Sequence, residues 1–182
     1  MSGGVEVRLL APEVVAVAFH EASYGDATAM EPVGVCRPCR NRTKFTPPEP
    51  ATGGLVYIVT ESRGRATPAT SAADIVLRRG SEVLAPVAGR VTRVKRYRLY
   101  GRYRDIRIVI RPDGVPDRRV VLLHLDRLRV RAGDRVAASA TRIGVVRRFR
   151  FESQVDRYVR GRYAHVHLEV KDPEARRMAT KP

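Results

Sequence analysis

Three of the four histidines lie in two short runs, Leu-His-Leu at 123–125 and His-Val-His-Leu-Glu-Val at 165–170. Side chains alternate between the two faces of a strand, so His165, His167 and Glu169 share one face while the apolar residues between them share the other. The two imidazoles on that face are about 7 Å apart along the strand. This geometry suits a metal ligand beside a second imidazole that polarises a bound water or substrate. An amphipathic strand whose polar face happens to carry histidine explains the spacing equally well.

Further motifs place this run in a wider pattern. They are, in chain order, Ala-Ala-Asp-Ile at 72–75, Val-Leu-Ala-Pro-Val-Ala-Gly-Arg-Val at 83–91, Leu-His-Leu at 123–125, Val-Arg-Ala-Gly-Asp-Arg-Val at 130–136 and His-Val-His-Leu-Glu at 165–169. In this order they resemble the lysostaphin-like (LytM-type) zinc metallopeptidases, which cut peptidoglycan cross-links. The resemblance covers roughly residues 70–170, and its most specific part is the H-x-H-[LF]-E ending. The G-x-V and A-G-D-x-V pieces also occur in lipoyl-type domains and other duplicated hybrid motif proteins.

The resemblance implies roles for four of these residues. An aspartate at the start of the sheet and the second histidine of H-x-H bind zinc in the family, and these positions are Asp74 and His167 here. The family's catalytic histidines orient the water and stabilise the transition state, and their positions here are His124 and His165.

One family ligand is missing at its expected position. The family has a histidine four residues before the aspartate, where this chain has Thr70. A catalytic zinc normally has three protein ligands and a water, and a neutral threonine hydroxyl is a poor ligand. The domain is therefore either a degenerate, non-hydrolytic relative or one that recruits a replacement. The remaining histidine, His20, is the candidate replacement, although a lone histidine after an apolar run is more often an ordinary strand or loop residue.

Cys36 and Cys39 form a single C-x-x-C motif without a second cysteine pair. Structural zinc usually needs four ligands, so the pair alone does not define a zinc site. A disulfide in an oxidising compartment and two thiols in a loop both remain open, and redox activity is only weakly indicated.

The chain is strongly basic, with 35 Lys and Arg against 19 Asp and Glu and a formal net charge of +16. Only four of the basic residues are lysine, and such an arginine excess is as typical of a GC-rich genome as of a function. Basic and tyrosine residues alternate between 90 and 104, which is typical of surfaces that bind nucleic acid or another polyanion. The candidate residues of this surface are Arg93, Arg96, Arg98, Arg102 and Arg104. An exposed arginine face with no ligand is the alternative.

The elements that must position these residues are mostly short strands. The predicted strands span 5–10, 14–19, 55–60, 73–77, 89–97, 105–111, 119–125, 128–130, 142–146 and 164–170. This spacing predicts an all-β fold of antiparallel sheets, a sandwich or barrel, and the resemblance implies the duplicated hybrid motif. Residues 153–160 predict one inserted helix, with Ser153 and Asp156 as a capping box. Prolines between 46 and 50 indicate a connector, so we expect an N-terminal extension at 1–54 and the β domain at 55–182.

The sequence leaves three hypotheses for function. The first is a peptidoglycan-associated, LytM-like domain with an impaired zinc site, acting in binding or regulation. The second is an active zinc endopeptidase completed by His20, and the third is a basic domain that binds nucleic acid or another polyanion. No apolar run reaches the roughly 18 residues of a membrane span, and the apolar run at 14–19 is too short for a signal peptide. The resemblance implies an extracytoplasmic location and peptidoglycan or an anionic wall polymer as partner.

Overall fold

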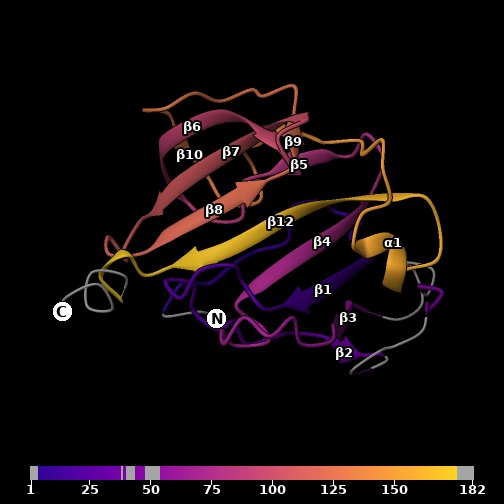
Figure 1. The fold of residues 1–182 in the computed structure, drawn as a ribbon. Helices are drawn as coiled ribbons and strands as arrows, with labels where there is room; N and C mark the ends of the chain where they lie inside the picture. Colours follow the sequence, from indigo (N-terminus) through magenta and orange to yellow (C-terminus); the bar gives the residue numbers. More distant parts are fainter. Residues whose placement is uncertain (1–3, 38, 40–43, 48–53, 176–182) are drawn as a thin grey trace.

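The computed structural model describes residues 4–37, 39, 44–47 and 54–175, and nearly all regular structure in them is β-strand (Figure 1). The strands are β1 Ala16–His20, β2 Val35–Cys36, β3 Val56–Val59, β4 Ala72–Arg78, β5 Glu82–Leu84, β6 Gly89–Leu99, β7 Tyr103–Pro112, β8 Arg119–Leu123, β9 Leu125–Asp126, β10 Arg135–Val136, β11 Arg142–Val146 and β12 Tyr163–Lys171. One short helix, α1 Val155–Tyr158, precedes β12. No helix in the described part of the chain is long and apolar enough to span a membrane. The predicted all-β fold is confirmed.

Two sheets contain all of these strands. The larger has the order β10-β6-β7-β8-β12-β4-β1-β3-β2, and the smaller has the order β5-β11-β9. Neighbouring strands run antiparallel, as predicted, except that β3 runs parallel to both β1 and β2 at one edge of the larger sheet. The sequence did not predict these parallel pairs.

The core of the protein lies against one face of the larger sheet. Alternate residues of its strands, such as Ile75 of β4 and Leu168 of β12, form one buried apolar cluster with Val83, Ile143 and Val146 of the smaller sheet. The opposite face of β4 and β12 therefore carries the other alternate residues, which include the polar ones. The period of two in the sequence thus separates a core face from a site face.

Strand β1 comes from the stretch predicted as an N-terminal extension. It is paired on both sides, with β4 and with β3, and all five of its residues are buried. Figure 1 shows β1 beside β4 in the larger sheet. The predicted division at residue 54 stays a prediction, but β1 takes part in the same sheet as the later strands.

Several predicted elements differ in the structure. Residues 5–10 form no strand, although Val5 and Leu10 are buried, because this segment makes isolated backbone bonds with Pro86 and Leu84 instead of a ladder. Residues 128–130 form no strand either. The strand predicted at 119–125 breaks at His124, whose φ of 68° is left-handed, so that β8 and β9 belong to different sheets.

The helix is shorter than predicted and begins at Val155 rather than near Ser153. The main-chain N–H and the hydroxyl of Ser153 both donate to the carboxylate of Asp156, at 2.6 and 2.7 Å. Val155 and Val159 pack on Ala16 and Val76, so the helix covers one end of the site face.

Candidate active site

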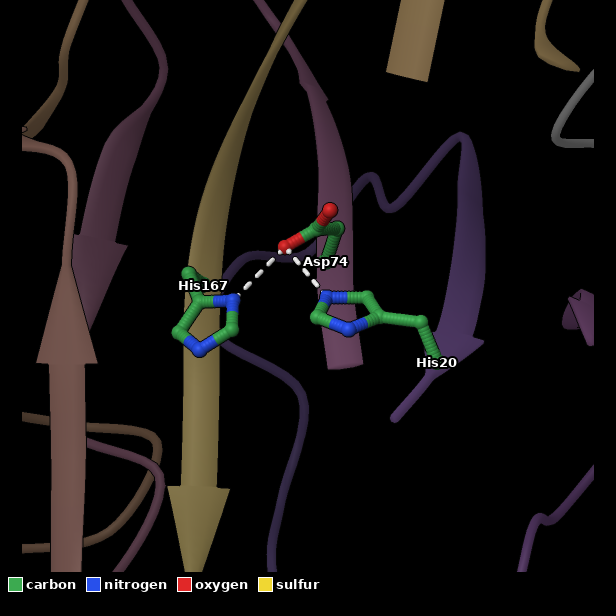
Figure 2. A group of neighbouring side chains, drawn as sticks. All are labelled: His20, Asp74 and His167. Atoms are coloured by element: carbon green, nitrogen blue, oxygen red, sulfur yellow. Dashed lines mark hydrogen bonds and ion pairs between the residues drawn. The ribbon is translucent and has the colours of Figure 1, made fainter. Parts of the chain in front are cut away.

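Strand register brings three predicted site residues to one place on the site face. His167 of β12 lies directly opposite Asp74 of β4, and Asp74 lies directly opposite Ala18 of β1. His20, two residues along β1 from Ala18, has its side chain on the same face. Figure 2 shows the two imidazoles on either side of one carboxylate oxygen of Asp74.

The ligand atoms of these three residues form a compact group. His167 Nδ1 lies 2.9 Å from Asp74 Oδ1, and His20 Nε2 lies 3.3 Å from the same oxygen. All three ligand atoms are within 4.8 Å of one another. His20 and Asp74 are only 3% and 4% exposed. His20, Asp74 and His167 therefore form a group that is able to hold a metal ion.

The hydrogen bonds of the two imidazoles fix which nitrogen faces the group. His20 Nδ1 donates to the main-chain oxygen of Glu21 at 2.9 Å, and its buried Nε2 has no hydrogen-bond partner. His167 Nε2 donates to Glu169 at 3.1 Å. Histidines that ligate metals usually donate their other N–H to a carbonyl or a carboxylate in this way. The unpartnered Nε2 of His20 and the carboxylate oxygen of Asp74 that it faces suit a cation between them.

The charges around the group are strongly coupled. Burial raises the pKa of Asp74, but the imidazoles of His165, His20 and His167 outweigh it and hold this pKa well below its usual range. Burial lowers the pKa of His167, but its hydrogen bonds to Asp74 and Glu169 outweigh burial and raise it to about 9. Burial likewise raises the pKa of Glu169, whereas His167 and Lys171 bring it down to about 2. The neighbourhood therefore favours charged carboxylates next to a cation.

His124 lies beside this group and is held by a carboxylate that the sequence did not identify, Asp105 of β7. His124 Nδ1 donates to Asp105 Oδ2 at 2.7 Å, and Tyr97 donates its hydroxyl proton to the same oxygen at 2.5 Å. The other oxygen, Oδ1, accepts the main-chain N–H of Ile106 and lies 3.4 Å from the guanidinium of Arg147. Burial raises the pKa of Asp105, but these donors outweigh it and lower this pKa. The hydrogen bond to Asp105 therefore occupies Nδ1 and leaves Nε2 as the other ring nitrogen of His124.

His165 is the most enclosed of the histidines on β12. Its ring stacks on Phe149 at 4.8 Å and lies 5.2 Å from the ring of His124, centroid to centroid. Its Nε2 is 3.9 Å from Asp74 Oδ2, and its buried Nδ1 has no hydrogen-bond partner. Burial lowers the pKa of His165 to about 4, so the ring is neutral at neutral pH.

A groove of about 530 Å³ is lined by all four histidines and by Asp74 and Glu169. Apart from the histidines and acids already described, its walls include aromatic and basic residues, among them Arg63, Lys95, Tyr97, Arg107, Phe149 and Phe151. All four histidines line this one groove, together with Asp74.

The other candidate residues lie elsewhere. The main-chain oxygen of Thr70 accepts the N–H of Met30 at 3.0 Å, and Thr70 does not line the groove. Cys36, the last residue of β2, forms a disulfide with Cys39, which answers the open question of their state. The five arginines predicted to bind polyanions are exposed on the β6–β7 hairpin; they are Arg93, Arg96, Arg98, Arg102 and Arg104.

The chain is similar to lysostaphin. The lysostaphin structure matches 54% of the chain with 20% sequence identity and a TM-score of 0.40, and the match spans about a third (35%) of lysostaphin itself. LytU matches 62% of the chain with 26% identity and a TM-score of 0.43, over 67% of its own length. No family model and no curated protein matches the chain.

Proposed function

We propose that this protein is a zinc-dependent peptidase that cleaves peptidoglycan cross-links, with His20, Asp74 and His167 as its zinc ligands. One observation carries the proposal: the Nε2 atom of His20 is buried, lacks a hydrogen-bond partner and faces the same oxygen of Asp74 as His167 does. Three protein ligands leave a fourth position for water, which is the pattern of catalytic zinc sites.

The residues present fit a zinc ion. Two imidazole nitrogens and one carboxylate oxygen are ordinary zinc ligands, and both histidines have the outer hydrogen bonds that orient metal ligands. His167 Nδ1 would hold the ion after giving up the proton that it donates to Asp74. Zinc would supply Lewis acidity, which polarises the scissile carbonyl and acidifies a water.

The two remaining histidines have the positions of proton carriers. Asp105 holds the Nδ1–H of His124, so His124 Nε2 accepts a proton from the attacking water and passes it to the leaving amine. His165, stacked on Phe149 beside the metal ligands, orients the water or the tetrahedral oxygen by a hydrogen bond. The groove with its aromatic walls holds the peptide next to these groups.

Peptidoglycan as substrate rests on the sequence motifs that resemble the LytM-type peptidases. A peptidoglycan substrate implies that the protein acts outside the cytoplasmic membrane. The Cys36–Cys39 disulfide is consistent with this location, because disulfides persist in oxidising compartments.

A competing function follows from Thr70. If histidine at that position is indispensable, the domain binds peptidoglycan without cutting it and acts in regulation. The two functions are separated by exposing purified cell walls to the protein with and without a metal chelator. The peptidase proposal expects release of peptide amino groups that stops with chelator and returns with added zinc. His165→Ala is the matched control, because it is expected to keep the zinc and lose the cleavage. Walls that stay intact at full zinc occupancy would favour the binding function.

We also propose that the β6–β7 hairpin binds an anionic wall polymer through Arg93, Arg96, Arg98, Arg102 and Arg104. Arg98 and Arg104 lie directly opposite each other in the ladder, and like charges in such a pair are destabilising without an anion. Changing all five to Gln is expected to weaken binding to teichoic acid and to flatten its salt dependence. Unchanged binding would place the polymer elsewhere, with the basic segment 142–162 as the next candidate. Equal loss of binding to DNA is expected, since phosphate contacts carry no sequence information.

A further inference from the structure

A single row of residues crosses the larger sheet through the proposed metal ligands. His167 of β12 lies opposite Leu123 of β8, Leu123 lies opposite Arg107 of β7, and Arg107 lies opposite Lys95 of β6. Residues directly opposite in neighbouring strands point to the same face of the sheet. Lys95, Arg107 and Leu123 accordingly line the same groove as Asp74 and His167.

The two cations of this row have no acidic partner. Among the described residues neither Lys95 nor Arg107 makes an ion pair with a carboxylate. Two like charges directly opposite each other in an antiparallel pair destabilise the sheet. The other basic side chains of the groove are engaged: Lys171 bonds to Asp26 at 2.7 Å, and Arg63 bonds to Gln154.

In the described part of the chain, the three acids that line the groove are also engaged: Asp26 with Lys171, and the other two within the metal group. Asp74 faces His20 and His167, and Glu169 faces His167 and Lys171. None of the three makes an ion pair with Lys95 or Arg107. The groove therefore has a compact negative end at the proposed metal ligands and an unbalanced positive end on β6 and β7.

We propose that Lys95 and Arg107 form a subsite for a carboxylate of the substrate, so that the preferred substrate is an acidic peptide. This inference rests on the proposed peptidase function. Neighbouring strands are about 4.8 Å apart, so Arg107 lies about 10 Å and Lys95 about 14 Å from His167 along the row. An extended peptide advances about 3.3 Å per residue, which places the acidic residue about three positions from the scissile bond.

The test compares peptides that differ by one group. In one series a single glutamate stands two, three or four positions to either side of the scissile bond, and in the matched series glutamine replaces it. Dissociation constants are measured on the His165→Ala protein, which is not expected to turn the peptides over. We expect one glutamate peptide to bind about tenfold more tightly than its glutamine partner, as two solvent-accessible charge contacts allow. We expect this preference to shrink as salt rises.

Variants then locate the preference. Lys95→Gln and Arg107→Gln are each expected to reduce it, and the double variant is expected to abolish it. Arg111→Gln is the matched control, because Arg111 is an exposed arginine of β7 that does not line the groove and is expected to leave the preference unchanged. Circular dichroism checks that each variant folds, and Lys95 is exposed enough for its variant to do so.

The outcomes are distinguishable from those of the proposed function. No preference for glutamate in the unsubstituted groove, or a preference that survives in the double variant, overturns the subsite while leaving wall cleavage and zinc binding untouched. If the preference depends on Lys95 and Arg107 but the protein does not cut cell walls, the result supports the subsite and contradicts the proposed peptidase function.

Discussion

Two buried aspartates, Asp74 and Asp105, each hold histidines in the same groove, but their surroundings differ. Asp105 accepts hydrogen bonds from the hydroxyl of Tyr97, the main-chain N–H of Ile106 and the imidazole of His124. In the described residues, the close ion pairs of Asp74 are all to imidazoles, and one of them, His20, points an unpartnered nitrogen at it.

This difference shows how two carboxylates of the same type acquire different chemistry. Both oxygens of Asp105 already accept hydrogen bonds, so this carboxylate is suited to hold His124 in one orientation. The surroundings of Asp74 include a buried imidazole nitrogen without a hydrogen-bond partner, which suits a shared cation. We therefore propose that Asp74 binds the metal and that Asp105 positions His124.

The largest effect is expected from Asp74→Asn. An amide at this position removes the only carboxylate of the proposed ligand group, so we expect loss of bound zinc and of wall cleavage together. Metal analysis of the purified variant, alongside cleavage of purified walls, measures both. If the variant keeps one zinc per chain, Asp74 is not a zinc ligand.

Asp105→Asn is expected to separate the two properties. Zinc content should stay unchanged, while kcat falls about 100- to 1,000-fold because His124 loses its orientation and its supporting charge. Parallel loss of zinc would mean that Asp105 supports the metal group after all.

The sequence predicted one side of this comparison better than the other. The motifs predicted Asp74 and His167 as zinc ligands, which stays a prediction, and the period of two placed His165, His167 and Glu169 on one face. Asp105 lies in an alternating run, Asp-Ile-Arg-Ile at 105–108, where it looks like one more exposed polar residue. Only the pairing of β7 with β8 brings Asp105 near His124, where the strand is interrupted. Pairing between distant strands leaves no local signal in the sequence.

The fold shows the same limit. Long alternating strands were predicted close to their observed bounds, whereas two-residue strands such as β9 and β10 carry too little pattern to be identified. His20 was a candidate ligand only by elimination. Its place near Asp74 depends on β1 pairing with β4, across more than 50 residues of chain.

Glu169→Gln is expected to weaken zinc binding moderately. Its carboxylate accepts the proton of His167 Nε2, and loss of such an outer carboxylate typically costs 10- to 100-fold in metal affinity. Competition with a chelating dye measures the zinc dissociation constant. An unchanged constant would show that Glu169 serves Lys171 rather than the metal ligand.

The smallest effect is expected in the contribution of Asp105 to the free energy of unfolding, which should depend on pH. The pKa of Asp105 is lower in the folded protein than in the unfolded chain, so its contribution is complete above the unfolded value of about 4 and is lost as the pH falls through the lowered folded pKa. Urea unfolding should therefore show native protein more stable than Asp105→Asn by about 1–2 kcal/mol at pH 7. This difference should narrow below pH 4. A difference that does not change with pH would contradict a charged Asp105.

The most direct test of the central claim is the zinc stoichiometry of the protein purified without chelator, compared between His20→Ala and Thr70→Ala. Both variants shorten one side chain to the same residue, but only His20 belongs to the proposed ligand group. The account predicts close to one zinc per chain for the native protein and for Thr70→Ala, and a large loss for His20→Ala. Full zinc occupancy in His20→Ala would contradict it.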